Sequence, residues 1–320
     1  MRDRPTSGGM RSASILVGLL LAGAPDASAQ DVGRTLGGHT FQPSGLVRSE
    51  PFITQHFRSQ TSGGFATGFR VPAIIGDSTR ALEGDVGYLG LGAEYQHAFG
   101  RWLAVRLYVG GSGRLGTSGE SLLSQGVTAV YSGALDATVK LFRWETAMIS
   151  GGVRFGSSQI YGSDILGYVN QVIEEGGPPD DRGLVVSTDA STARFSLLGA
   201  WAPAAWLGFS ALGSVGWGDV FSAEDRSGTL YAGGGVASFD LRPLVGVPVG
   251  LSAGLDYDSI TEQGADIGTK VWGSSFGLHY TGRENFELSL EYTNRRLPVD
   301  EYDEDLVVNA IGFNIRYYWR

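Results

Sequence analysis

The main pattern along this chain is an alternation of hydrophobic and polar residues with a period of two. In residues 305–320, Val307 and Ile311 fall on one face of an extended strand, while Asn314 and Arg316 fall on the other. Successive side chains of a strand point to opposite faces, so the segment predicts a strand with one apolar and one mixed face. Similar alternation predicts about twelve strands, at residues 64–72, 86–99, 103–112, 125–141, 145–157, 191–201, 206–217, 229–241, 247–258, 269–281, 285–296 and 305–319.

The connections between these strands alternate between short and long. Short connections are expected at 100–102, 142–144, 202–205, 242–246 and 282–284, and long ones at 73–85, 113–124, 158–190, 218–228, 259–268 and 297–304. Transmembrane β-barrels have an even number of antiparallel strands, short periplasmic turns and longer outer loops. The pattern therefore predicts an all-β fold, a transmembrane antiparallel β-barrel occupying residues 64–320.

Tryptophan is also distributed as such a barrel requires. All seven tryptophans fall at predicted strand ends, where an aromatic girdle lies at the two membrane interfaces: Trp102, Trp144, Trp201, Trp206, Trp217, Trp272 and Trp319. Core tryptophans of a soluble barrel are the alternative, but a soluble core has no reason to place them at strand ends.

The first 29 residues have the order of a signal peptide. Arg11 precedes an apolar run at 15–22, and Ala27-Ser28-Ala29 supplies a small-x-small cleavage site, so the mature chain is expected to start at Gln30. The run is about half of the roughly 20 residues that a membrane helix needs. A buried N-terminal helix is the alternative.

Composition agrees with an exported β protein. Glycine is abundant at 50 of 320 residues, only 18% of residues are charged, and there is no cysteine. Neither disulfides nor a thiolate metal site can hold this fold together. The net charge of −9 argues against a basic surface that binds nucleic acid.

These features together resemble the porin-like outer-membrane β-barrels of Gram-negative bacteria, without pointing to one family. The closing strand ends in aromatics, although Arg320 follows Trp319. The resemblance implies a location in the cell outer membrane, contact with outer-membrane lipid, and insertion by the barrel assembly machinery, which reads the C-terminal strand.

Strand parity assigns a set of charged residues to the lumen. A lipid-facing Arg or Lys at the bilayer midplane costs about 2–4 kcal/mol, which favours the inward assignment. The expected acids and bases are equal in number: Glu94, Asp136, Asp240, Asp256, Glu287 and Glu291, with Arg106, Lys140, Arg154, Arg194, Arg295 and Arg316. Such balance fits either a filled lumen or a narrow passage, because twelve strands lie between filled eight-stranded barrels and open porins.

Two segments leave alternatives open. Residues 30–63 are polar, and they could form a periplasmic tail or a plug inside the lumen. The plug alternative is similar in architecture to the N-terminal hatch of the long-chain fatty-acid transporter family, and residues 46–57 could also add a strand. Residues 165–175, within the long connection 158–190, have helical spacing. They could form a helix on the outer loop, an inward constriction, or a packed surface loop.

The expected function is passive, selective passage of a small solute through a charged lumen, with no cofactor and no metal. Neutralising Arg106, Arg154, Arg194 or Arg316 is expected to change ion selectivity. The alternative is a closed structural or adhesion barrel that acts through its outer loops. An outer-membrane lipid hydrolase is more distant, since His279-Tyr280-Thr281 has Thr where those enzymes carry Ser, and nucleophilic catalysis needs an activated hydroxyl.

Overall fold

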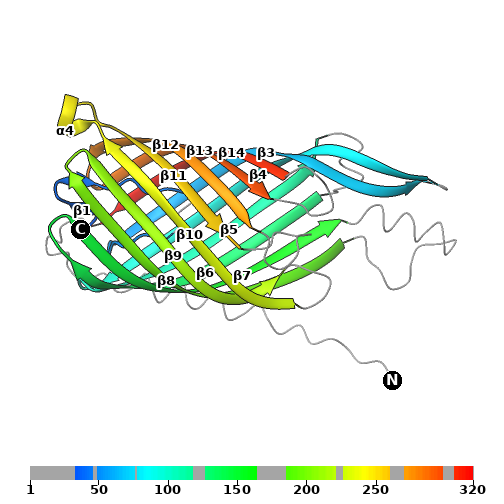
Figure 1. Cartoon of the computed structure of the whole chain (residues 1–320), viewed down its shortest axis with the longest axis horizontal. Coiled ribbons are helices and arrows are strands. Elements are labelled where there is room, and N and C mark those ends of the chain that lie inside the picture. Colours follow the sequence, from blue (N-terminus) through cyan, green and yellow to red (C-terminus); the bar gives the residue numbers. More distant parts are fainter. Residues whose placement is uncertain are drawn as a thin grey trace, which may run out of the picture. The chain divides into compact units, whose positions relative to one another are not determined.

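The computed structural model describes residues 33–45, 49–75, 78–117, 127–163, 185–220, 226–259, 270–297 and 306–319. Twelve antiparallel strands form one closed barrel (Figure 1), which confirms the predicted fold class. The strands are β3 (His56–Ile75), β4 (Ser78–Phe99), β5 (Leu103–Gly116), β6 (Val127–Arg143), β7 (Ala147–Ser163), β8 (Val185–Ala204), β9 (Leu207–Val220), β10 (Arg226–Asp240), β11 (Val249–Asp258), β12 (Val271–Arg283), β13 (Phe286–Leu297) and β14 (Leu306–Tyr318).

The first and last strands close the barrel. In the β3–β14 ladder, His56 pairs with Tyr318 and Thr67 with Val307. Strand β3 therefore starts eight residues before the predicted Gly64. The C-terminal half of β14, residues 311–318, pairs with residues 56–63 of β3. Closure leaves no unpaired sheet edge, which a membrane-spanning sheet requires.

The first hairpin also differs from the prediction. The expected long connection 73–85 is largely strand, because β3 runs to Ile75 and β4 begins at Ser78. Pro72 lies in β3 opposite Ala81 despite lacking a donor. Within the short connection 242–246, residues Arg242–Val245 form the single helical turn α4. The predicted helical segment 165–175 lies outside the described residues.

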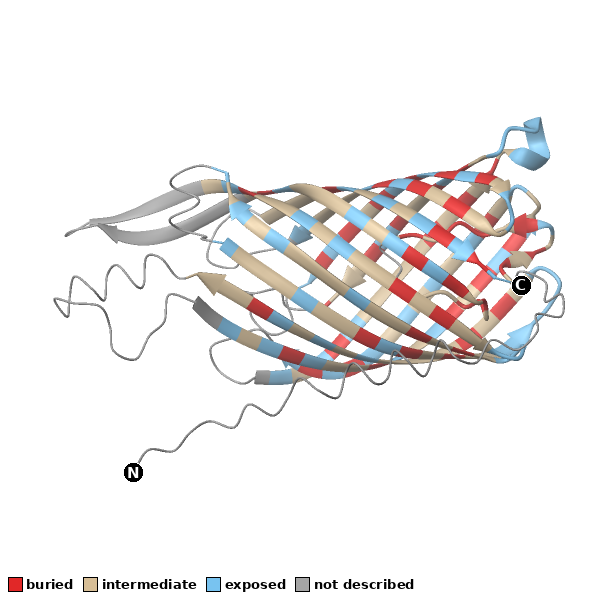
Figure 2. Cartoon of the chain, turned by 180° about the vertical axis from the view of Figure 1, so that it is seen from behind, coloured by how far each residue is buried: buried red, intermediate tan, exposed pale blue. Residues whose placement is uncertain are grey.

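The two faces of the wall differ in burial. Where burial is described, more buried and more exposed positions alternate along much of the wall (Figure 2), as the period of two requires. The exposed face is a broad apolar band that includes Leu91 (60%), Phe155 (58%), Leu197 (59%) and Phe276 (62%). Soluble proteins rarely expose apolar patches of this extent, so this surface faces lipid. Among the described residues, no helix is long and apolar enough to cross a membrane.

All seven tryptophans lie on this outer surface, with 37–61% of each residue exposed. Neighbouring aromatics accompany several of them, and Trp144 stacks on Phe142 with 5.8 Å between ring centroids. Trp319 meets Tyr317 edge-on at 5.4 Å. Exposure on the outer surface is what the predicted girdle requires of these residues, and their position at the two membrane interfaces stays a prediction.

Candidate functional site: the lumen and the N-terminal segment

The lumen contains part of the chain's own N-terminus, residues 33–55, which we call the N-terminal segment; its residues 46–48 are not described. It starts with a small hairpin, β1 (Thr35–Leu36) and β2 (His39–Thr40). Gly37 and Gly38 form the two-residue turn with φ values of 54° and 81°. This left-handed backbone explains the glycine pair, because two-residue hairpins favour such turns.

The hairpin lies at the short-turn end of the barrel. The Gly37 amide donates to the Glu145 carbonyl at 2.8 Å, and the Arg143 guanidinium donates to the Thr35 carbonyl at 3.1 Å. His39 Nδ1 is 3.3 Å from the Ala205 carbonyl oxygen. Glu145 and Ala205 are in short turns and Arg143 ends β6, so the hairpin is anchored where those turns meet.

An apolar cluster fastens the N-terminal segment to the wall. Leu36, Phe41 and Phe52 are each no more than 4% exposed, and they pack with Met148, Ala200 and Ala202 of β7 and β8. Phe41 and Phe52 contact each other with ring centroids 5.1 Å apart. Fully burying a Phe or Leu side chain contributes about 1.5–3 kcal/mol, so this cluster contributes substantially to docking.

A buried ion pair joins the start of the N-terminal segment to the opposite wall. Arg34 Nη1 lies 2.9 Å from Glu287 Oε2, and both side chains are less than 5% exposed. The Arg34 guanidinium also stacks over the Tyr318 ring, 4.4 Å from its centroid. A buried charge is tolerated only with such compensation.

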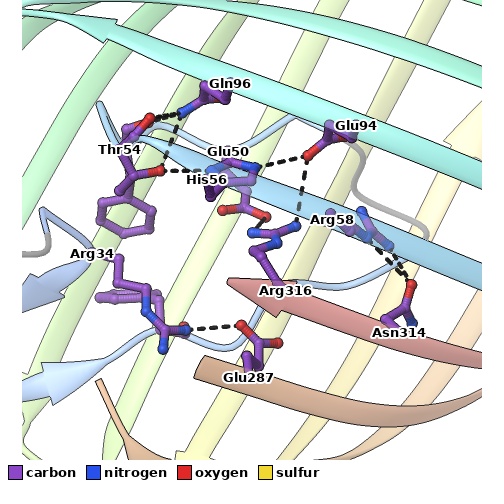
Figure 3. A network of polar contacts seen from close by, with 12 residues as sticks. Arg34, Glu50, Thr54, His56, Arg58, Glu94, Gln96, Glu287, Asn314 and Arg316 are labelled. Atoms are coloured by element: carbon purple, nitrogen blue, oxygen red, sulfur yellow. Dashed lines mark hydrogen bonds and ion pairs between the residues drawn. The ribbon is translucent and has the colours of Figure 1, made fainter. Parts of the chain in front are cut away.

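A second charge on the N-terminal segment has the opposite sign. Glu50 Oε1 accepts from Arg316 Nη1 at 2.7 Å (Figure 3). Ser49 Oγ accepts from Arg106 Nη2 at 3.1 Å. Further along, Thr54 contacts both Gln96 and His56. The N-terminal segment thus presents a base to an acidic wall position and an acid to basic wall positions.

A third set of contacts lies midway along the N-terminal segment. The Ser44 hydroxyl donates to Glu291 Oε1 at 2.7 Å, and the Gly45 amide donates to Glu291 Oε2 at 2.6 Å. Ser44 Oγ also lies 3.3 Å from Ser275 Oγ. Both oxygens of the Glu291 carboxylate are therefore held by the N-terminal segment.

Above the N-terminal segment the lumen is a cavity of about 550 Å³. Gly45 and Ser49 form part of its lining, and strands on all sides supply the rest. Polar side chains that line it include Gln60, Tyr108 and Asn314, and apolar side chains such as Ile160 and Leu212 line it as well. The cavity lies on the long-loop side of the segment.

The strand register arranges eight inward charges in two runs of four, which we together call the charged belt. The two runs meet where Arg106 Nη1 lies 3.7 Å from Glu94 Oε2. Cross-strand partners are Glu287 and Arg316, Arg316 and Arg58, Arg58 and Glu94, then Arg106 and Asp136, Asp136 and Arg154, and Arg154 and Arg194. Ion pairs form along it, at 3.2 Å from Arg106 to Asp136 and 3.4 Å from Arg154 to Asp136.

The remaining predicted lumen residues lie elsewhere on the wall. Arg295 of β13 pairs with Asp256 of β11 at 3.4 Å, and both residues line the cavity. Asp240 accepts from the Thr281 hydroxyl at 3.1 Å and from the Arg242 amide at 3.0 Å, near the short turns. Lys140 is half-buried near the end of β6, beside a register shift between Lys140 and Phe142, and is separate from the belt.

The set predicted from strand parity lacks several charged residues of this site, including Arg114 and Asp219, which line the cavity. Arg34 and Glu50 lie in a segment without alternation, and Arg58 precedes the predicted start of the first strand. Asp258 ends the predicted strand 247–258 and shares the parity of Asp256, but it is not among the expected lumen acids; it pairs with Arg194 at 3.1 Å. The sequence does carry a signal for Arg58, because apolar Phe57 precedes it. In the structure Phe57 is 43% exposed on the outer face, and Arg58 is buried on the inner face.

Three of the four histidines lie in this buried region. His279 Nε2 is 2.8 Å from Ser252 Oγ, and its Nδ1 is 3.5 Å from Glu287 Oε1. Thr281, the hydroxyl considered from sequence, instead donates to Asp240. Ser252 is 4% exposed and faces the lumen, so lipid in the membrane does not reach it. Within the described residues, no group of acids and histidines is arranged to hold a metal ion.

Acidification is expected to loosen the N-terminal hairpin through His39. Burial lowers the pKa of His39, against the opposing effects of the Ala205 carbonyl and the Asp240 charge. Released from the lumen, His39 regains its ordinary pKa of about 6.5. The released state therefore binds the proton more tightly, and docking weakens as the pH falls below that value.

Hydrogen exchange of residues 33–45, corrected for the intrinsic rate, should be faster at about pH 5.5 than at about pH 7.5. His39→Gln keeps a polar side chain and should abolish this difference. Equal pH dependence in the variant would assign the effect to another group.

The fold and lumen define a class: a membrane-spanning β-barrel whose short-turn end holds its own N-terminal segment. No family model matches the chain, and no curated protein matches it. Among solved structures, an outer-membrane channel from Pseudomonas putida F1 is similar with a TM-score of 0.53 and 10% identity, covering 87% of this chain and 100% of that one. The translocator domain of the autotransporter NalP from Neisseria meningitidis gives 0.51 and 12%, covering 86% and 91%. The NanC porin gives 0.48 and 8%, covering 81% and 98%. At these identities the likeness shows the fold of outer-membrane barrels alone.

Proposed function

We propose that this protein is an outer-membrane channel for a small polar solute, closed at its short-turn end by the N-terminal segment. The observation that carries the proposal is the charged cavity of about 550 Å³ with a floor made by a separate segment. A barrel whose lumen served only structure would be filled by wall side chains, as eight-stranded barrels are. Here the wall side chains leave a cavity, and the N-terminal segment, which is not part of the barrel wall, lies across its short-turn end.

The chemistry of the lumen supports selectivity. Arg58, Arg154 and Arg194 line the cavity together with Asp256 and Asp258. Oppositely charged groups on different walls orient a dipolar solute and exclude apolar ones. Export by residues 1–29, cleavage before Gln30, and insertion through the C-terminal strand are part of this proposal.

The test is a disulfide lock on the full-length mature chain. The natural chain has no cysteine, so Ser44→Cys with Ser275→Cys introduces one pair, at positions whose hydroxyl oxygens are 3.3 Å apart. In a planar bilayer we expect low conductance when the pair is oxidised and higher conductance after reduction. Ser44→Cys alone controls for the reductant.

A second form of the chain separates the remaining outcomes. A chain lacking residues 31–54 should conduct in a folded barrel regardless of redox state. Conductance that is equal in oxidised, reduced and truncated forms would show that the N-terminal segment does not close the channel. Silence in all three forms, with the barrel folded, would favour the structural or adhesion barrel. A chain lacking 160–188 would then test that role, because an adhesion function should disappear with those residues.

A further inference from the structure

Two arginines of the charged belt lie side by side where the N-terminal segment meets the cavity. Arg58 of β3 and Arg316 of β14 are direct cross-strand partners, and both point inward (Figure 3). Arg58 is 6% exposed and Arg316 is 2% exposed. Like charges placed directly opposite each other destabilise a sheet. This arginine pair therefore favours an anion between or beside its members.

The N-terminal segment supplies that anion. Glu50 Oε1 lies 2.7 Å from Arg316 Nη1, whereas the wall carboxylate Glu94 is more distant, at 3.9 Å from Arg316 Nη2. Glu94 is shared, since it also accepts from His56 Nε2 at 2.9 Å and faces Arg106 at 3.7 Å. Glu50 is thus the principal counterion of Arg316, and it belongs to the N-terminal segment and not to the barrel wall.

The arginine pair also has donor capacity that Glu50 does not use. Arg58 donates from Nε and Nη2 to Asn314 Oδ1, a neutral acceptor, at 3.3 and 2.9 Å. Among the described residues, the buried Arg316 Nε has no hydrogen-bond acceptor. Arginine forks match carboxylates by paired N–H donors, and a neutral amide is a weaker partner.

A solute in the cavity reaches the Arg58 member of this pair, whereas Arg316 is not part of the cavity lining. Arg58, Asn314 and Ser49 all line the cavity, and Ser49 immediately precedes Glu50. Tyr108 and Gln60 also line the cavity, and Gln60 Nε2 donates to the Tyr108 hydroxyl at 3.3 Å. Their hydroxyl and amide groups can bind the hydroxyls of a solute. The site combines a carboxylate clamp with neutral polar neighbours.

We propose that the arginine pair binds the carboxylate of a small hydroxylated acid, and that Glu50 occupies the site as its internal counterpart. This inference rests on the proposed channel function. The solute carboxylate binds Arg58 and takes the place of the Glu50 carboxylate on Arg316. Loss of that contact weakens docking of the N-terminal segment, so solute binding and opening are coupled. By linkage, anything that releases Glu50 strengthens solute binding equally.

The experiment measures binding of gluconate to the full mature chain by calorimetry, with glucitol as the uncharged counterpart. Glu50→Gln removes the internal competitor and should tighten gluconate binding roughly tenfold, since the competing charged hydrogen bond is lost. Arg58→Gln should abolish the binding, and Arg242→Gln, in the exposed turn, is the matched control. Gluconate should also speed hydrogen exchange at residues 49–55 in the unchanged chain, and glucitol should not.

Each result decides the proposal. Tighter binding to Glu50→Gln together with loss in Arg58→Gln supports it. Equal affinity of the unchanged chain and both variants, or equal binding of gluconate and glucitol, overturns it. Phosphate binding as tightly as gluconate would overturn the carboxylate class. If the reduced or truncated chain conducts but does not bind gluconate, this inference fails and the channel function stands; if no form conducts, the channel function fails.

Discussion

Replacing Arg34 with methionine is expected to release the N-terminal segment from the lumen. Arg34→Met keeps an unbranched apolar stem without the guanidinium, and it leaves Glu287 buried without its ion-pair partner at 2.9 Å. Removing one member of a buried pair costs about 3–5 kcal/mol. Once the segment undocks, water again reaches Glu287. The variant therefore lowers the free energy of docking of the N-terminal segment, and the strands of the barrel stay folded.

The measurement is hydrogen exchange of residues 33–45, together with conductance in a planar bilayer. Both should rise in Arg34→Met and stay unchanged in Arg242→Met, an exposed arginine at the same end of the barrel. Adding Glu287→Gln should restore part of the docking, because the variant wall no longer buries an unpaired charge. Unchanged exchange and conductance in Arg34→Met would mean that the apolar cluster alone holds the segment.

The double variant Arg34→Met with Glu287→Gln shows whether the effects of the two substitutions on docking are coupled or simply add. Tyr318 contacts both partners, since its ring lies under Arg34 and its hydroxyl is 3.3 Å from Glu287 Oε2. Glu287 also lies 3.5 Å from His279 Nδ1. The interaction energy from the cycle therefore includes this surrounding network and should be compared with the same cycle in Tyr318→Phe.

The barrel could be predicted from sequence because its signal is local. Strand parity needs only neighbouring residues, and β5 shows it well, with Arg106 buried and Val109 52% exposed. The first part of β3 was not predicted because its outward positions Ser59, Thr61 and Gly63 are not apolar. Without an apolar face, the alternation that reveals a strand disappears, although the backbone pairing with β14 is regular.

The docking of the N-terminal segment could not be predicted in detail. Arg34 and Glu287 are 253 positions apart, and Glu50 and Arg316 are 266 positions apart. Their meeting depends on barrel closure and register, which no local pattern encodes. Sequence left a tail and a plug as alternatives for residues 30–63, because a polar stretch without periodicity fits both. The contacts of the described residues lie on the inner wall.

Introducing arginine at Phe276 is expected to prevent stable insertion of the barrel into a bilayer. Phe276 is 62% exposed and lies midway between Trp272 and Tyr280 on the outer face of β12. A lipid-facing arginine near the bilayer midplane costs about 2–4 kcal/mol. The effect should appear as a lower free energy of unfolding in lipid vesicles and a smaller folded fraction.

The matched control places the same charge on the other side of the wall. Thr293 lies on the adjacent strand β13, opposite Ser275, and lines the cavity. Thr293→Arg should leave folding in vesicles nearly unchanged, because its guanidinium enters a polar lumen instead of hydrocarbon. Equal losses in both variants would mean that the exposed apolar band does not face lipid. A large loss in Phe276→Arg alone ties the outer face of this barrel to the membrane and its inner face to water, which is the arrangement that a channel requires.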